Sequence, residues 1–435
     1  VVEAGALFVT VRISKRLLHC EVEQTLTLWN NDARLDLQTR IYWWGARHQQ
    51  VRMVLPGAAN HASLTYGAPF YGVGWTETAE GTAPRNGDEI LPPDQMNYRE
   101  VQGWLHSLLA EAPRWRPAAG EVLSDAAVLA AERGFCAADA ALLGMMAALA
   151  ALDQSLSTVP AEFTRQRRYF PLLGEPRPAA FSPMPRALFQ PGHPHALYAV
   201  MGDADWVIRC MEMGVKLVQL RLKDPAPGEL DAQIARCAEA AGRHGALLII
   251  NDHWQAALRH LLHRNGHGIY GVHMGQEDLQ TLSDADLDRL MLSGLRLGLS
   301  THSLWELSRA LRTRPSHVAC GPVHATTTKD MPWIPLGDTN VGWWAQLVHG
   351  EGDAHQPPLP LVAIGGMQPD RAEAAAAAGA DMVAVVSDIT GAADPAHAVQ
   401  ALREAIARGH GQRAATPAPE WPEPTLRPVP CVPMY

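Results

Sequence analysis

Two basic side chains and one amide alternate at the end of a short apolar run. The stretch VQLRLKD places Gln219, Arg221 and Lys223 two residues apart. If this stretch is a β-strand, the three side chains share one face, because successive side chains of a strand point to opposite sides. A solvated edge strand would show the same alternation. In a buried parallel sheet, however, two inward cations are costly unless an anion meets them. The run therefore predicts an anion-binding site.

Two carboxylates follow the next two apolar runs. Asp252 comes directly after Asn251 in LIIND, and Asp278 follows the run at 271–275. Carboxylates at neighbouring strand ends, close to an anion site, suit a Mg²⁺ ion that bridges a diphosphate. Taken singly, each aspartate could instead cap the helix that follows it. The pair, with Asn251 between strand and loop, favours the metal site.

Hydroxyl groups follow the fifth and sixth runs. Ser300 and His302 end the fifth run, whereas Ser303 is expected to cap the next helix. His302 is either a general base or a packing residue at the start of that helix. After the sixth run, residues 326–329 (TTTK) offer three hydroxyl donors and one charge to a phosphate.

Small residues end the last two runs. Gly365 and Gly366 end the seventh run, and Val386 and Ser387 lie at the end of the eighth. Paired glycines let a phosphate approach backbone N–H groups, and this pair of loops is a common phosphate site in barrels. A glycine pair can also form only a tight turn.

The runs that carry these residues recur regularly over about 210 residues. Helix-like stretches follow most of them, which predicts an α/β fold with a parallel sheet closed as a (β/α)₈ TIM barrel. A doubly wound open sheet is the alternative, but polar residues at nearly every run's C-terminal end favour the barrel. The predicted strands are 196–200, 217–223, 246–252, 271–275, 295–301, 317–323, 359–366 and 382–388.

The rest of the chain divides into three parts. Residues 1–112 hold short alternating runs separated by turns, which predict an antiparallel β-sandwich-like domain. Residues 113–190 hold two predicted helices, one capped by Ser124 or Asp125 and one at 137–155, and then an extended proline-rich linker. The barrel occupies residues 191–410, and residues 411–435 are predicted to be a disordered tail.

Composition limits the classes of function. The chain has 435 residues and a formal net charge of −9, which argues against non-specific nucleic-acid binding. Its six cysteines form no CxxC pair, and neither a membrane span nor a signal peptide is apparent. We therefore expect a cytoplasmic protein with reduced thiols that acts on small molecules, without nucleic-acid or membrane partners.

One predicted diphosphate site and one separate phosphate site suit an enzyme that joins two phosphorylated small molecules and releases diphosphate. At this point residues 196–407 resemble the thiamine phosphate synthase family. The resemblance rests on seven motifs in order: VQLRLKD, LIINDHW, GVHMGQEDL, LGLSTHS, CGPVHATTTK, VAIGGM and VAVVSDI. The family is a transferase of thiamine biosynthesis. It joins 4-amino-2-methyl-5-(diphosphooxymethyl)pyrimidine to a carboxythiazole or hydroxyethylthiazole phosphate.

The resemblance implies a role for each motif. Asp252 and Asp278 would bind Mg²⁺, the implied cofactor. Arg221, Lys223 and Lys329 would be catalytic and would assist departure of diphosphate in a dissociative mechanism without a protein nucleophile. The residues implied to hold the pyrimidine diphosphate are Gln219, Leu220, Arg221, Leu222, Lys223, Asn251, Ser300 and Lys329. Those implied to hold the thiazole phosphate are Thr326, Thr327, Thr328, Gly365 or Gly366, Val386 and Ser387.

Two features depart from the family's pattern. His324 and Ala325 stand where the family usually has an aromatic residue and a proline, and the loop at 261–268 is longer than usual. Neither removes a predicted ligand.

Weaker resemblances mark the N-terminal half. Residues at about 120–190 resemble the tail of hydroxymethylpyrimidine phosphate kinase, through Ala138–Ala140 and YFPLLG at 169–174. Residues at about 1–112 resemble the β-domain of family 38 α-mannosidases, through TLTLWNNDARLDLQTRIYWWG and LTYGAPFYGVGW. The alternative hypothesis is therefore a carbohydrate-binding or glycosidase-accessory protein with a degenerate barrel, although the barrel's intact charged residues favour the synthase.

Overall fold

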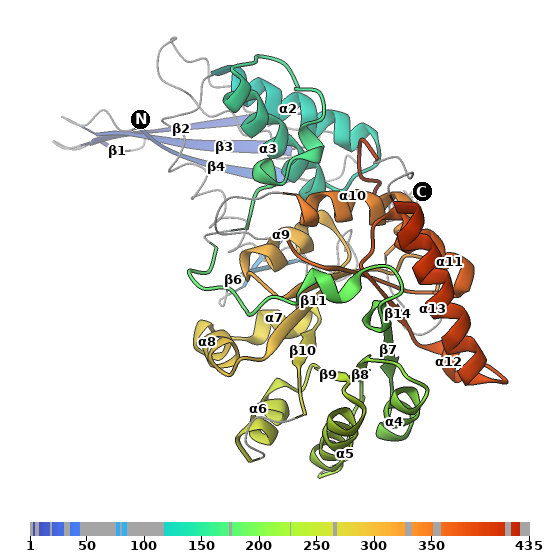
Figure 1. Cartoon of the computed structure of the whole chain (residues 1–435). Helices are drawn as coiled ribbons and strands as arrows, with labels where there is room; N and C mark the ends of the chain where they lie inside the picture. The colour runs from blue at the N-terminus through green and yellow to red at the C-terminus, as the bar shows by residue number, and fades with distance from the viewer. Residues whose placement is uncertain are drawn as a thin grey trace, which may run out of the picture. The chain divides into compact units, whose positions relative to one another are not determined.

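The fold is known from a computed structural model of the chain (Figure 1). The structure describes residues 3–4, 8–17, 20–29, 35–43, 75–78, 81–84, 117–173, 176–226, 228–263, 268–326, 333–350, 358–413 and 419–426. The chain divides into two compact units. The first comprises Val1–Val54 and Pro69–Asp88, and the second comprises Leu55–Ala68 and Glu89–Tyr435.

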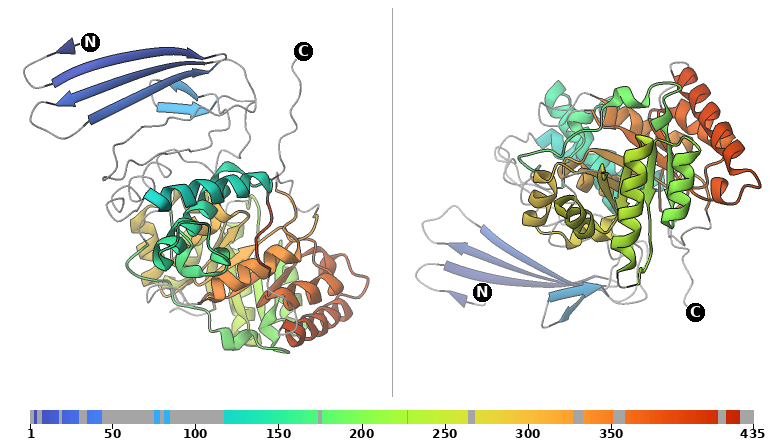
Figure 2. Two further views of the ribbon diagram at one scale, coloured as in Figure 1. Left: turned by 90° about the horizontal axis from the view of Figure 1, so that it is seen from above. Right: turned by 60° about the horizontal axis from the view of Figure 1, so that its bottom comes forward.

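The first unit contains an antiparallel sheet in the order β1-β2-β3-β4 (Figure 2). Its strands are β1 (Glu3–Ala4), β2 (Phe8–Leu17), β3 (Cys20–Trp29) and β4 (Leu35–Trp43). A separate antiparallel pair joins β5 (Trp75–Thr78) to β6 (Gly81–Pro84). The antiparallel strands predicted from the alternating runs of this region are confirmed. The alternating run at 51–55, which also predicts a strand, lies outside the described residues.

The second unit contains a closed barrel of parallel strands, in which the last strand pairs with the first. Each strand is a short run that is buried nearly throughout, as expected for a parallel sheet covered by helices. All eight predicted strands are present, although several end before the residue predicted. They are β7 (Leu197–Met201), β8 (Leu217–Leu220), β9 (Leu247–Asn251), β10 (Gly271–Met274), β11 (Arg296–Thr301), β12 (His317–Cys320), β13 (Leu361–Ile364) and β14 (Met382–Val385).

Helices connect these strands, and several begin at a side chain that caps them. Asp203 accepts a hydrogen bond from the Trp206 N–H, and Ser303 accepts one from the Glu306 N–H, which confirms the predicted cap. The helices are α4 (Ala204–Glu212), α5 (Glu229–His244), α6 (Trp254–His263), α7 (Gln276–Thr281), α8 (Asp284–Leu292), α9 (Leu304–Arg312), α10 (Gly337–His349), α11 (Pro369–Ala378), α12 (Ser387–Thr390) and α13 (Pro395–Gln412).

The helical segment before the barrel is part of the same apolar core (Figure 1). It consists of α2 (Pro117–Glu132) and α3 (Ala137–Gln154). Because α2 begins at Pro117, Ser124 and Asp125 lie inside this helix and do not cap it, contrary to the prediction. The carboxylate of Asp139 in α3 accepts a 2.9 Å hydrogen bond from the Trp305 N–H in α9. Burial raises the pKa of Asp139 to about 7.

The proline-rich stretch before the barrel contacts it along its length. The Ser308 hydroxyl donates to the Pro171 carbonyl at 2.6 Å, and the Phe181 N–H donates to the Arg314 carbonyl at 3.0 Å. Met184 and Phe189 are buried among the inward side chains of the barrel strands. This stretch contains the short 3₁₀ helices η2 (Phe163–Arg165), η3 (Arg167–Tyr169), η4 (Arg186–Phe189) and η5 (Pro194–Ala196). The stretch that was predicted to be an extended linker is therefore packed against the barrel as part of the second unit.

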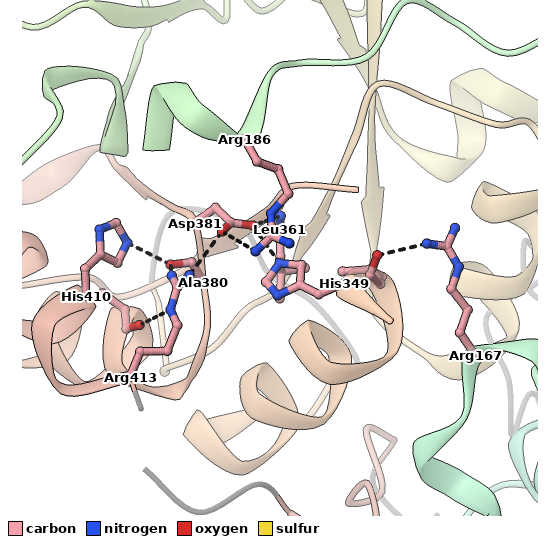
Figure 3. Close-up of polar contacts among 10 residues, drawn as sticks. Arg167, Arg186, His349, Leu361, Ala380, Asp381, His410 and Arg413 are labelled. Atoms are coloured by element: carbon pink, nitrogen blue, oxygen red, sulfur yellow. Dashed lines mark hydrogen bonds and ion pairs between the residues drawn. The ribbon is translucent and has the colours of Figure 1, made fainter. Parts of the chain in front are cut away.

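Asp381 joins the residues before and after the barrel (Figure 3). It directly precedes β14 and is 2% exposed. Its carboxylate accepts hydrogen bonds from the Leu361 N–H at 2.9 Å and from His349 Nε2 at 2.7 Å. Ion pairs from Arg186 at 3.5 Å and Arg413 at 3.2 Å complete the cluster. One buried carboxylate thus holds η4, α10 and the end of α13 against the barrel.

The C-terminal residues differ from the predicted disordered tail. Residues 419–426 contact α10, η2 and the loop after β12, and Thr425 is 2% exposed. Residues 414–418 and 427–435 lie outside the described part of the chain.

Candidate active site

The predicted anion site lies where β8 ends. This strand ends at Leu220, so Arg221 to Lys223 belong to the following loop and not to the strand, contrary to the prediction. The Arg221 N–H still donates to the Met201 carbonyl at 2.7 Å, which extends the ladder by one residue. Gln219 is buried, Arg221 is half-buried and Lys223 is exposed. The Gln219 amide is therefore enclosed by the barrel and the Arg221 backbone is bonded to β7, whereas Lys223 is exposed to solvent.

A series of side-chain hydrogen bonds connects β7, β8 and β9. The Tyr198 hydroxyl donates to Gln219 Oε1 at 2.6 Å, and Gln219 Nε2 donates to Asn251 Oδ1 at 2.6 Å. Asn251 Nδ2 in turn donates to the Asp252 carboxylate. Burial raises the pKa of Tyr198, which keeps its phenol protonated and able to donate. Tyr198 was not identified from the sequence. The only signal there was its position in the strand sequence LYAVM, where alternate residues face the same side.

The two predicted metal ligands lie close together. Asp252 follows β9 with a backbone φ of 59°, and Asp278 lies in the first turn of α7. The pKa of Asp252 is raised to about 6, mainly by burial and then by the charge and hydrogen bond of Asp278, while Arg221 opposes the rise. Gly275 occupies the N-cap position of α7, so Asp278 is not the cap of that helix. Two like charges held together in a partly buried place favour the binding of a cation.

Behind the carboxylates, two imidazoles support Ser300. His273 Nε2 lies 2.9 Å from the Ser300 hydroxyl, and its Nδ1 lies 3.4 Å from Nε2 of His317. Gln276 Nε2 donates to the Ser300 carbonyl at 2.7 Å. Burial, and to a lesser degree Arg221, lowers the pKa of His273 to about 4, so the ring is neutral at pH 7.

His273 and Gln276 were missed as site residues, although both stand in the motif GVHMGQEDL. Gly298 makes the imidazole arrangement possible. A Cβ at this position would lie 2.2 Å from His317 Nε2 and 2.5 Å from His273 Nδ1.

The loops after β12 and β13 approach each other through two glycines. Gly365 has a φ of 109° and Gly366 a φ of 62°. A Cβ on Gly365 would lie 2.7 Å from Pro322, and one on Gly366 would lie 2.6 Å from the Ala325 carbonyl. Backbone hydrogen bonds from Val323 to Ile364 and from His324 to Gly365 hold these loops together. Glycine is required here by both conformation and space.

Three of the predicted phosphate residues follow β12 and β14, the two strands that flank β13 in the barrel. Thr326 is half-buried in the loop after β12, and Ser387 begins the short helix α12 after the neighbouring strand β14. Val386 directly precedes that helix and is half-buried. Thr327, Thr328 and Lys329 lie outside the described residues.

Two other histidines have protein partners. His302 Nδ1 lies 2.7 Å from Glu306 Oε2, and its ring stacks on Trp333 with an interplanar angle of 8°. Of the two roles predicted for His302, these contacts favour packing at the start of α9. His324 Nε2 lies 3.8 Å from Asp338. The extended loop at 261–268 is described only at its ends.

One end of the barrel thus combines four features. They are the Asp252 and Asp278 carboxylates, the hydrogen-bonded amides of Gln219 and Asn251, the Arg221 side chain, and the closely spaced loops after β12 and β13. Within the described part of the chain, no group of three or more His, Cys, Asp or Glu side chains could hold a metal ion, so substrate oxygens would have to complete any coordination shell. Fold and site together define a (β/α)₈-barrel enzyme that acts on phosphorylated small molecules.

Comparison with known proteins narrows this class. A family model for thiamine monophosphate synthase matches residues 197–389. Thiamine-phosphate synthase of Neisseria meningitidis serogroup A is 42% identical over 210 residues, which are 48% of this chain and 94% of that protein. The Cronobacter sakazakii enzyme of the same name is 41% identical over 224 residues, or 52% of this chain and 95% of its own. The chain belongs to the thiamine monophosphate synthase family.

Among solved structures, thiamine phosphate pyrophosphorylase from Pyrococcus furiosus aligns with 50% of this chain and 98% of its own, with 22% identity and a TM-score of 0.41.

Proposed function

We propose that the barrel, residues 191–410, is a thiamine phosphate synthase. It joins the pyrimidine diphosphate to a thiazole phosphate and yields thiamine phosphate and diphosphate. The observation that carries this proposal is the 42% identity to a synthase across 94% of that enzyme's length. The site supports it, since Gln219, Asn251 and Asp252 are joined by hydrogen bonds at the strand ends where the proposed substrate would bind.

Each half of the site would hold one substrate. Gln219, Arg221, Lys223, Asn251, Ser300 and Lys329 would bind the pyrimidine diphosphate. Thr326 to Thr328, the two glycines after β13, and Val386 with Ser387 would bind the thiazole phosphate. The described members of the two groups lie in or directly after different strands, β8 to β11 for the first and β12 to β14 for the second. This separation supports a site that would bind both phosphorylated substrates at the same time.

The carboxylate pair fits a magnesium ion. The raised pKa of Asp252 has burial as its main cause and the nearby Asp278 as its second, and a bound cation relieves both by favouring the ionised forms. Asp252 and Asp278 would hold Mg²⁺, which when bound supplies positive charge to the diphosphate. Two protein ligands are typical of magnesium sites that complete their shell with substrate phosphate and water.

Catalysis would be electrostatic and positional. Arg221, Lys223 and Lys329 would neutralise the charge that develops on the departing diphosphate. The hydrogen-bonded side chains of Gln219 and Asn251, together with Ser300 and its neutral partner His273, would orient the pyrimidine. The thiazole nitrogen would then attack the exposed methylene carbon, so that the carbon–nitrogen bond forms as the carbon–oxygen bond breaks or after it has broken. No protein nucleophile is needed.

The setting proposed for this reaction is the cytoplasm, with small molecules as the only partners. Cys136, Cys210, Cys237 and Cys320 are unpaired thiols, as expected in a reducing compartment. No helix in the described residues has the length and apolar character to cross a membrane. Residues 1–112 are proposed to be a separate β-rich domain that contributes no residue to this chemistry.

Genetic complementation tests the proposal. A bacterium that lacks its own thiamine-phosphate synthase should grow without added thiamine when it expresses the full chain. The Asp252→Ala variant, expressed at the same level, should fail to support growth. Absence of growth with a soluble full chain would reject the proposal.

A further inference from the structure

Two histidines of neighbouring barrel strands meet across a glycine. His273 is paired with Gly298 in the β10–β11 ladder, and Gly298 is paired with His317 in the β11–β12 ladder. The three residues therefore lie at one level of the barrel, and the absence of a side chain on Gly298 leaves room for both imidazoles. The ring centroids lie 5.5 Å apart, and His273 Nδ1 lies 3.4 Å from His317 Nε2.

His317 lies one residue layer away from the candidate site. It is 0% exposed at the start of β12, and it was not identified from the sequence. Burial lowers the pKa of His317 well below its ordinary value, so the ring is neutral at pH 7, like that of His273. Among the described residues, no hydrogen-bond partner lies within reach of its Nδ1.

This unpaired nitrogen decides which tautomer His317 adopts. A neutral imidazole carries one proton, on Nδ1 or on Nε2. A proton on Nδ1 would create a buried N–H without an acceptor, which is rarer and more costly than a buried lone pair without a donor. The proton of His317 therefore belongs on Nε2, from which it is donated to His273 Nδ1.

The tautomer of His273 follows from that of its partner. Since Nδ1 of His273 accepts the bond from His317, its own proton lies on Nε2. This Nε2 lies 2.9 Å from the Ser300 hydroxyl, which therefore accepts a hydrogen bond from the ring. The hydroxyl proton of Ser300 is then not used by His273. Because Ser300 is half-buried at the end of β11, this proton can be donated to a molecule in the site.

We propose that His317 is a positioning residue that makes Ser300 a hydrogen-bond donor to the pyrimidine diphosphate. Through His273, it directs the serine proton toward an acceptor atom of this substrate, and it disfavours molecules that present an N–H group at the same place. The bond is set before the substrate arrives, so no reorganisation is needed on binding. The inference rests on the proposed function, because it concerns substrate recognition at that same site.

Nitrogen-15 NMR of the free full chain tests the hydrogen-bond directions without any substrate. With ring-labelled histidine at pH 7, His273 should show a protonated Nε2 and a bare Nδ1. Its signals are identified by their absence from the His273→Gln variant. A bare Nε2 and a protonated Nδ1 would overturn the proposal, since Ser300 would then donate to the ring.

A matched pair of variants tests the consequence for the reaction. His317→Met has a similar length but no donor, whereas His317→Gln keeps an N–H near the position of Nε2. We expect kcat/KM for the pyrimidine diphosphate to fall by about tenfold or more in His317→Met and to be largely retained in His317→Gln. The KM for the thiazole phosphate should stay unchanged in both variants.

His410→Met is the control for the loss of a buried imidazole. His410 is 7% exposed, and its Nε2 lies 3.0 Å from the Ala380 carbonyl, so this change should leave kcat/KM unaltered. If His317→Met lowers only the amount of folded protein, with kcat and KM per folded molecule unchanged, His317 serves stability alone and the proposal is wrong. A full chain that makes no thiamine phosphate would instead reject the proposed function, and the NMR result would still establish or refute the hydrogen-bond directions.

Discussion

At the residue scale, the main feature of the proposed site is a pair of carboxylates that lie close together. Asp252 and Asp278 come from neighbouring strands of the barrel, and burial with mutual repulsion raises the pKa of Asp252 to about 6. Because its ionised form binds a cation, metal affinity should rise as the pH increases through about 6. A divalent ion bound by both carboxylates would reduce the repulsion between them.

Removal of the Asp278 charge should therefore change the pKa of Asp252. In metal-free protein, Asp278→Asn should lower the pKa of Asp252, measured by carbon-13 NMR of the carboxylates against pH. The same variant should lower turnover by about 10²-fold, since a ligand of the proposed metal is lost. The exposed Asp284→Asn is the matched control and should change neither quantity. An unaltered Asp252 pKa in the Asp278 variant would show that the two carboxylates do not interact.

Gly298 should be intolerant of any side chain. Gly298→Ala places a Cβ 2.2 Å from His317 Nε2, and both imidazoles are buried, so neither can move freely. We expect the free energy of unfolding to fall by about 1–3 kcal/mol, measured by urea denaturation. Gly242→Ala in α5 meets no atom within 4 Å and should instead be neutral or stabilising. Equal stability of the two variants would contradict the close approach at Gly298.

At the element scale, the barrel is held to its flanking segments by Asp381. Burial alone would raise the pKa of this carboxylate, but His349, the Leu361 N–H and Arg186 overcome it and lower the pKa to about 2. A group with a depressed pKa contributes stability above its unfolded pKa of about 4, and that stability is lost as the pH falls toward 2.

Asp381→Asn should therefore destabilise the protein at pH 7 by about 2 kcal/mol. The difference in free energy of unfolding between wild type and variant should shrink as the pH falls from about 4 to 2. Chemical denaturation at several pH values measures this. A difference that is constant across this range would mean that the carboxylate's charge contributes nothing to stability.

The elements with strong sequence patterns were the ones that could be predicted. Eight short buried runs with polar ends identified the barrel, because parallel strands covered by helices must be apolar throughout. The segments around Met184, Phe189 and Trp421 carry no periodicity, since each packs through a single large side chain between prolines. Their docking depends on pockets made by distant residues, which no local pattern encodes.

The site residues also divide into those with a local sequence signal and those without one. The placement of Asp252, Asp278, Gln219 and Asn251 at or just after strand ends could be predicted, and the proposal that they bind a ligand rests on the cost of leaving such groups without one. His273 could not, because a single histidine in a buried strand is equally compatible with packing. Its role follows only from the 2.9 Å contact with Ser300, across two strands.

At the scale of the whole molecule, the catalytic unit extends beyond the span shared with the family. Leu142, Leu143 and Met146 of α3 are fully buried in one core with the barrel helices. A chain that begins at Pro117 should keep the unfolding temperature of the full chain's barrel, together with its activity. A chain that begins at Phe189 should unfold at a lower temperature or aggregate, since it exposes the apolar surface that α2 and α3 cover. Equal melting temperatures and activities for both truncations would show that the helical segment is dispensable.

The most direct test of the central claim is product formation by the purified full chain. The two substrates, the pyrimidine diphosphate and the thiazole phosphate, are mixed with Mg²⁺ and the protein, and both products are quantified over time. We predict thiamine phosphate and diphosphate in equal amounts, with no product when either substrate is omitted or when Mg²⁺ is chelated. Diphosphate release without thiamine phosphate, or no turnover by folded protein with Mg²⁺ and both substrates, would contradict the assignment of this barrel as a synthase.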